Sequence, residues 1–236
     1  MGFLMPRKKT IAVEILFNNW GKDPLRLTRE WIEYRLDLFL ATAAMSLQRQ
    51  TSQDFTCFVT CDPASVDLIA ELLETRTALP PNIRFVSSAE YRRQERELVE
   101  QAEVFYRVFL SSDDMYRLDF IQYIHTCQPA EHVVALVPQY GYLYDSVQYR
   151  LGEFFFWLPS YGAMILDPER YLNRQYPHVH GRNTGTTFEN ALNWRDRQGR
   201  GAFSLEPWSN SERSRAVFGP EVTTPAQMQA ILDQYF

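Results

Sequence analysis

Residues 104–127 read VFYRVFLSSDDMYRLDFIQYIHTC, and this stretch decides the class of fold that the sequence predicts. Its first nine residues are mostly apolar, as in a buried β-strand, and residues 115–127 have the spacing of a helix. Two adjacent acids, Asp113 and Asp114, stand between these elements. The stretch therefore predicts a strand, a short acidic loop and a helix.

The same alternation of strand and helix occurs four times in the first 137 residues. We expect strands at residues 11–17, 55–62, 82–88, 104–112 and 132–138, and helices at residues 27–51, 63–76, 89–103 and 115–127. Such alternation is typical of a mostly parallel sheet with helices on its faces. The predicted fold class is therefore α/β.

The pattern changes after residue 138. Residues 140–166 are aromatic and predict antiparallel strands or hairpins, and residues 223–236 predict a closing helix. The segment 177–207 between them is rich in loop residues. No internal repeat or low-complexity linker divides the chain, so we expect one domain, residues 1–236, with an antiparallel, loop-rich C-terminal half at residues 138–236.

Composition excludes several classes of protein. The net charge of −5 argues against a nucleic-acid-binding protein, which is usually basic. No apolar run approaches the roughly 18 residues of a transmembrane segment, and the start MGFLMPRKKT is too short and polar for a signal peptide. Three cysteines favour a reducing compartment, with Cys57 and Cys61 as buried structural thiols. We expect a cytoplasmic protein.

The acid pair has two interpretations. In an α/β sheet, ligands bind beyond the carboxyl ends of the strands, where two carboxylates can hold Mg²⁺ or Mn²⁺ together with substrate phosphates. Alternatively, Asp113 caps the following helix and Asp114 is a favourable charge in its first turn. The pair alone leaves both interpretations open.

A second stretch bears on this choice. Residues 29–65, REWIEYRLDLFLATAAMSLQRQTSQDFTCFVTCDPAS, resemble the opening of the bacterial rhamnosyltransferase family, which has the A-type, nucleotide-diphospho-sugar glycosyltransferase fold. The shared positions are Trp31, Arg35, Leu36, Leu38, Phe39, Ser46, Gln50, Thr51, Asp54, Phe55 and Asp62. The family's next mark is an Arg-Leu-Asp-x-Asp-Asp strand end, whose last two acids match Asp113 and Asp114. Phe109 and Ser111 replace its arginine and its first acid.

The resemblance implies a single A-type glycosyltransferase-like domain. Residues 10–137 would bind a nucleotide-diphosphate sugar and residues 138–236 a glycan or other hydroxyl acceptor. Asp113 and Asp114 would hold Mn²⁺ or Mg²⁺, and a late histidine, His180, would be a third ligand. The donor-binding residues expected on this basis are Asn18, Trp20, Asp62, Ser111, Asp113 and Arg197.

Several of these residues also have simpler interpretations. Asn18 and Trp20 fit a surface loop, Asp62 fits a helix cap before Pro63, and Arg197 fits a solvated loop. An inverting transferase also needs a base for the acceptor hydroxyl. Glu153, Asp145 and Glu189 are candidates; we favour Glu153, since it precedes an aromatic segment where the acceptor would stack on Trp157.

Two rival functions remain. A nucleotidyltransferase shares this kind of sheet and metal site, but it normally needs a basic, glycine-rich loop near the first strand. The segment FNNWGKDP has one glycine and one lysine. The other rival is a degenerate, non-catalytic module that binds a sugar nucleotide or glycan, and Ser111 is its main support.

Overall fold

The structure is a computed structural model that describes residues 8–19, 23–130, 133–145, 149–155, 162–175, 187–195 and 220–236. For residues 139, 145, 154, 155 and 187–195 it describes the backbone alone. Four parallel strands form its centre and lie side by side in the order β3-β2-β1-β4. They are β1 (Lys9–Leu16), β2 (Thr56–Cys61), β3 (Ile83–Ser87) and β4 (Val104–Ser111). The predicted parallel sheet is therefore confirmed.

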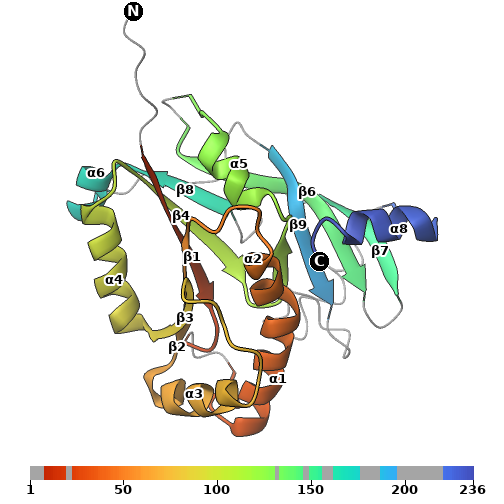
Figure 1. Cartoon of the computed structure of the whole chain (residues 1–236), viewed down its shortest axis with the longest axis horizontal. Helices are drawn as coiled ribbons and strands as arrows, with labels where there is room; N and C mark the ends of the chain where they lie inside the picture. Colours follow the sequence, from red (N-terminus) through yellow and green to blue (C-terminus); the bar gives the residue numbers. More distant parts are fainter. Residues whose placement is uncertain are drawn as a thin grey trace, which may run out of the picture.

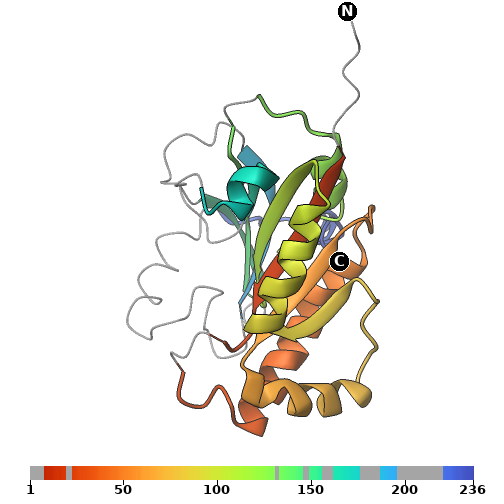
Figure 2. The same cartoon turned by 90° about the vertical axis from the view of Figure 1, so that its left-hand side faces the viewer.

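Helices cover both faces of this sheet (Figures 1 and 2). Since side chains alternate along a strand, Ile11, Val13 and Ile15 of β1 face one layer and Ala12 faces the other. The first layer holds α1 (Arg29–Phe39), the π-helical turn Leu40–Ala44, α2 (Met45–Gln48), α3 (Val66–Glu74) and α5 (Phe120–Thr126). The second holds α4 (Ser88–Glu100) and α6 (Pro168–Leu172).

The C-terminal half extends the sheet with mostly antiparallel pairs. β8 (Gly162–Leu166) runs antiparallel to β4, and β6 (Ala135–Asp145) runs antiparallel to β8. β7 (Arg150–Phe155) forms a hairpin with β6, whereas β9 (Thr187–Arg195) is parallel to β6. Short β5 (Asp114–Tyr116) closes the edge beside β9, and α8 (Pro225–Leu232) supplies Ile231 to the core cluster of Met115 and Leu151.

One predicted element is wrong in part. The helix expected at residues 115–127 begins only at Phe120, because Asp114–Tyr116 pair with residues 193–191 of β9. This pairing joins segments that are about 77 residues apart in the chain, so local periodicity does not reveal it. The short helix α6 was not expected either, and the helix expected at residues 27–51 contains a π-helical turn.

Two smaller expectations are also settled. Cys57 and Cys61 are free, fully buried thiols, as predicted, and burial raises the pKa of Cys61 to about 11. No helix in the described part of the chain has the length and apolar character needed to cross a membrane. The division of the chain into donor and acceptor halves stays a prediction.

Candidate functional site

Polar residues follow three neighbouring strands at one edge of the sheet. Asn18 and Asn19 come after β1, Asp62 after β2, and residues 112–114 after β4. Because these strands are parallel and adjacent, their carboxyl ends lie at the same edge, as expected. The strand order changes direction at β1, which has β2 on one side and β4 on the other. Open α/β sheets bind ligands at such a point.

Asp114 is the least satisfied group at this edge. Its side chain is fully buried, and neither carboxylate oxygen accepts a hydrogen bond from the described residues. Burial raises the pKa of Asp114 well above its usual value, and the charge of Asp113 raises it further. Ser111 and Arg35 oppose this rise, although Ser111 does not reach hydrogen-bond geometry. A buried carboxylate without a partner is costly and calls for a proton or a bound cation.

The helix-cap interpretation of the acid pair is wrong. Asp114 lies in β5, and α5 begins at Phe120 with Asp119 in the capping position. Asp113 and Asp114 are therefore six and five residues upstream of that helix's own cap. The structure thus removes the simpler explanation for two adjacent acids after β4.

Asp113 is held by an arginine from α1. Nη1 of Arg35 lies 3.3 Å from Oδ2 of Asp113, and Nη2 of Arg35 donates a hydrogen bond to the hydroxyl of Ser112. The ring of Trp31, one turn earlier on α1, lies 5.9 Å from the guanidinium. Trp31 and Arg35, two of the positions shared with the rhamnosyltransferases in sequence, thus place a cation beside the acid pair.

The acid pair suits a hard divalent cation. Such ions take oxygen ligands, and Mg²⁺ is often bound by one or two carboxylates with phosphates and waters completing the shell. Among the described residues no third histidine, cysteine or acid joins the pair, so the protein ligands found there are Asp113 and Asp114. The expected third ligand, His180, lies outside the described residues.

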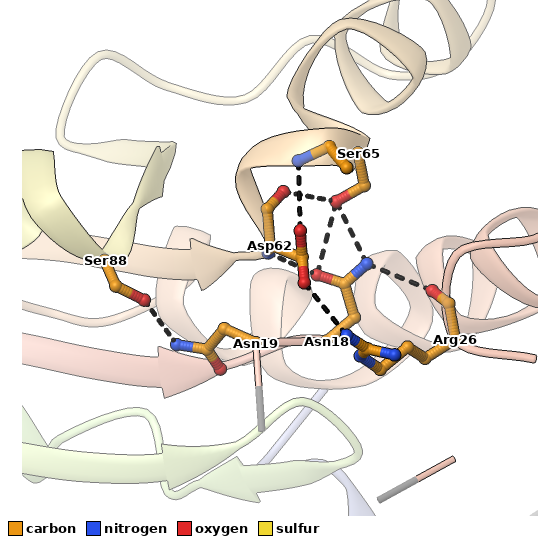
Figure 3. A network of polar contacts seen from close by, with 7 residues as sticks. Asn18, Asn19, Arg26, Asp62, Ser65 and Ser88 are labelled. Atoms are coloured by element: carbon orange, nitrogen blue, oxygen red, sulfur yellow. Dashed lines mark hydrogen bonds and ion pairs between the residues drawn. The ribbon is translucent and has the colours of Figure 1, made fainter. Parts of the chain in front are cut away.

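Asn18 and Asp62 belong to a structural network that Figure 3 shows. The buried amide of Asn18 donates to the carbonyl of Arg26 at 3.1 Å and to Ser65 Oγ at 3.0 Å, and it accepts from the Asp62 amide at 2.8 Å. The Asp62 carboxylate accepts from the amide of Ala64 and pairs with Arg26 at 3.1 Å. The helix-cap interpretation of Asp62 is confirmed, and donor contact by either residue stays a prediction.

Asn19 points to a pocket that we did not predict. Its amide donates to Thr60 Oγ1 at 2.9 Å and to Ser88 Oγ at 3.1 Å (Figure 3). Its Oδ1 atom is buried and has no hydrogen-bond partner in the part of the chain that the structure describes. The pocket has a volume of about 350 Å³ and lies between the sheet and the helices α4 and α6. It is lined by Glu14, Asn19, Ser88, Tyr91, Arg92, Glu95, Arg107 and Tyr171.

A charged network forms part of this pocket. Arg107 Nη2 lies 2.7 Å from Glu14 Oε2 and donates a hydrogen bond to it. Arg107 Nε lies 3.2 Å from Glu95 Oε1, an ion pair without a hydrogen bond. The hydroxyls of Tyr91 and Tyr171 donate to the two oxygens of Glu95. Glu14, an acid inside the apolar strand KTIAVEIL, was the signal in the sequence that could have revealed the pocket.

The predicted base, Glu153, lies on β7 and is exposed. The strand registers run from Asp114 to residue 193, then to Leu143, then to Gly152 beside Glu153. Three strand spacings amount to roughly 14 Å along the sheet. Glu153 therefore shares a site with the acid pair only if the bound substrates span this distance. Its role as the base stays a prediction.

Other expected residues cannot be placed. Trp20, Trp157, His180 and Arg197 lie outside the described residues. For Asp145 and Glu189 the structure gives only the backbone, in β6 and β9. Ser111 is the last residue of β4, and Ser112 separates it from the acid pair.

Comparisons with known proteins give a distant likeness in fold. No protein-family model and no curated protein matches the chain. Similar solved structures include TarS 1–349 of S. aureus, with TM-score 0.32 and 16% identity over 56% of this chain and 36% of that one. A 4-diphosphocytidyl-2C-methyl-D-erythritol synthase from Anaerococcus prevotii has TM-score 0.33 and 14% identity over 94% of both chains. This chain thus spans about a third of TarS 1–349, and the rhamnosyltransferase resemblance stays a prediction.

Proposed function

We propose that the protein is a metal-dependent glycosyltransferase that uses a nucleotide-diphosphate sugar. The carrying observation is Asp114: its carboxylate is fully buried and has no hydrogen-bond partner among the described residues. It lies next to Asp113, at the strand ends where ligands bind. Bound there, Mn²⁺ or Mg²⁺ would neutralise the charge of the departing diphosphate. The resemblance of residues 29–65 to rhamnosyltransferases supports the same class and makes rhamnose the first sugar to test.

The residues of the chain have distinct parts in this proposal. Asp113 and Asp114 hold the cation, with His180 as a further ligand. The base and ribose of the donor lie toward the pocket beside Asn19, whose Oδ1 atom has no partner among the residues described. Trp20 stacks on the base, Asp62 and Ser111 border the ribose, and Arg197 contacts the diphosphate.

The proposed transfer step requires an acceptor hydroxyl and one base. The acceptor oxygen attacks the anomeric carbon of the donor sugar, and the bond from that carbon to the diphosphate oxygen breaks. Glu153 takes the hydroxyl proton, and the acceptor sugar stacks on Trp157. The nucleoside diphosphate leaves with the electron pair of the broken bond.

A thermal-shift titration with Mn²⁺ and a panel of nucleotide-diphosphate sugars tests the proposal. We expect Mn²⁺ to raise the melting temperature of the wild type, to promote donor binding and to support slow donor hydrolysis. Both Asp113→Asn and Asp114→Asn should lose these responses. The matched control is Asp119→Asn, which removes a half-exposed acid paired with Arg117 and should keep them.

The other outcomes identify the rivals. Donor binding without any hydrolysis or transfer would favour the non-catalytic module, for which Ser111 in place of an acid is the supporting observation. Preference for a nucleoside triphosphate over every diphospho-sugar would favour a nucleotidyltransferase. No nucleotide response with any metal would rule out both the glycosyltransferase and the nucleotidyltransferase.

A further inference from the structure

Arg35 carries more hydrogen-bonding capacity than its protein contacts use. A guanidinium has five N–H donors, and the structure gives Arg35 one contact with Asp113 and one with Ser112. Its Nε atom is buried and has no partner among the described residues. The side chain keeps 21% of its surface exposed, so Arg35 is not sealed inside the core.

The orientation of Arg35 is prepared by α1. The ring of Trp31 lies 5.9 Å from the guanidinium, and Trp31 Nε1 donates to Asp23 Oδ2 at 2.8 Å, which fixes the ring. A fixed aromatic ring attracts a guanidinium from one side without holding its N–H groups. Arg35 can therefore exchange hydrogen-bond partners while it stays over the ring.

A divalent cation and Arg35 compete for the same carboxylate. Two like charges a few ångströms apart repel each other, and they do so more strongly near a protein surface than in bulk water. A cation bound by Asp113 and Asp114 therefore weakens the contact between Arg35 and Asp113. The diphosphate that arrives with the donor supplies new anionic oxygens, which suit the forked geometry of arginine.

We propose that Arg35 is an exchangeable counter-ion of the acid pair: it pairs with Asp113 when no cation is bound and with the donor diphosphate when one is. This assignment rests on the proposed metal site. This role and a purely structural one predict effects of opposite sign on cation binding when Arg35 is removed. A structural brace would make loss of Arg35 harmful to every ligand, whereas an exchangeable counter-ion makes its loss favourable for the cation and unfavourable for the diphosphate.

Calorimetric titration of Arg35→Met tests these opposite effects on cation and diphosphate binding. With Mn²⁺ alone, we expect the dissociation constant to fall about tenfold relative to the wild type, because the competing charge is gone. With inorganic pyrophosphate at saturating Mn²⁺, we expect it to rise about tenfold or more. The control is Arg29→Met on the same helix, an exposed arginine paired with Glu33 and Glu71, which should leave both constants unchanged.

Arg35→Lys keeps the test valid if the methionine variant folds poorly. A lysine keeps the charge but cannot contact Asp113 and Ser112 together as a fork. We therefore expect the Mn²⁺ affinity to rise and the pyrophosphate affinity to fall, each by less than in Arg35→Met. Mn²⁺ affinity that is equal to or below that of the wild type in the folded variants would overturn the assignment of Arg35 alone. Failure of every protein, wild type included, to bind Mn²⁺ would overturn the proposed metal site together with it.

Discussion

At the scale of single residues, the contrast between Asp113 and Asp114 is the central feature. Asp113 has a salt bridge with Arg35, whereas Asp114 is buried without a hydrogen-bond partner in the described structure. Leaving a buried polar group unsatisfied costs about 1–3 kcal/mol, and more for a charge. Proteins retain such groups where function requires them, at the expense of stability. Asp114 is therefore expected to destabilise the metal-free protein.

We predict that Asp114→Asn raises the free energy of unfolding of the metal-free protein by about 1–3 kcal/mol. In the folded state the pKa of Asp114 is raised above its usual value of 3.8. Protonation of Asp114 therefore stabilises the fold fully below pH 3.8, and this stabilisation is lost as the pH rises toward the folded-state pKa. The advantage of the asparagine should therefore grow as pH rises from about 4. Urea denaturation in EDTA over a pH series measures it. A variant less stable than the wild type throughout would contradict the prediction, and Asp119→Asn controls for loss of a surface acid.

The sequence predicted the residue types of the site better than their surroundings. Asp113 and Asp114 were found because adjacent acids after an apolar strand are conspicuous. The burial of Asn18 was not foreseen, because its partners Ser65 and the carbonyl of Arg26 lie on other segments. Glu14 was overlooked because a single acid does not disturb the apolar pattern of β1. Side-chain partners that come from distant segments cannot be read from local pattern.

At the scale of elements, the strands β1 to β4 were predictable because burial on both faces leaves continuous apolar runs. β5 was not, since its three residues form a strand only through pairing with β9. The helix α4 is an intermediate case. Its sequence, SAEYRRQERELVE, is mostly charged, as in a surface helix, yet Glu95 is 4% exposed. Glu95 stands in line with Tyr91 and Val99 at a spacing of four residues. The one buried acid of this helix thus lies on its apolar stripe.

We predict that Glu95→Ala lowers the free energy of unfolding by about 3–5 kcal/mol. The change leaves the hydroxyls of Tyr91 and Tyr171 without their acceptor and leaves Arg107 with Glu14 as its remaining ion-pair partner. These contacts join α4 and α6 to the sheet, so the loss should also loosen α6. Urea denaturation and hydrogen exchange of residues 168–172 would measure both effects.

A matched control lies two residues away on the same helix. Glu97 is half-exposed and pairs with Arg93 at 2.5 Å. Exposed ion pairs contribute about 0–1 kcal/mol, so Glu97→Ala should change stability by no more than that. Equal effects of the two substitutions would show that the Glu95 network does not hold the two helices to the sheet.

At the scale of the whole molecule, the C-terminal segment joins β5, the edge strand that contains Asp114, to the antiparallel half. The amide of Leu118, just after β5, donates to the carbonyl of Gln234, and the amide of Val222 donates to the carbonyl of Leu151 in β7. Tyr235 is fully buried in one cluster with Met115 of β5. The position of Asp114 therefore depends on residues more than 100 positions later in the chain, which local sequence pattern does not reveal.

We predict that Tyr235→Ala lowers the free energy of unfolding by about 3–5 kcal/mol, the usual cost of removing a large buried aromatic side chain. Because Tyr235 shares its cluster with Met115, the substitution should also speed amide exchange in residues 114–118 and weaken Mn²⁺ binding at Asp113 and Asp114. Gln229→Ala, at an exposed position of α8, should leave exchange and Mn²⁺ affinity unchanged. Tyr235→Ala with lower global stability but wild-type Mn²⁺ affinity would show that β5 holds the acids in place without the C-terminal segment.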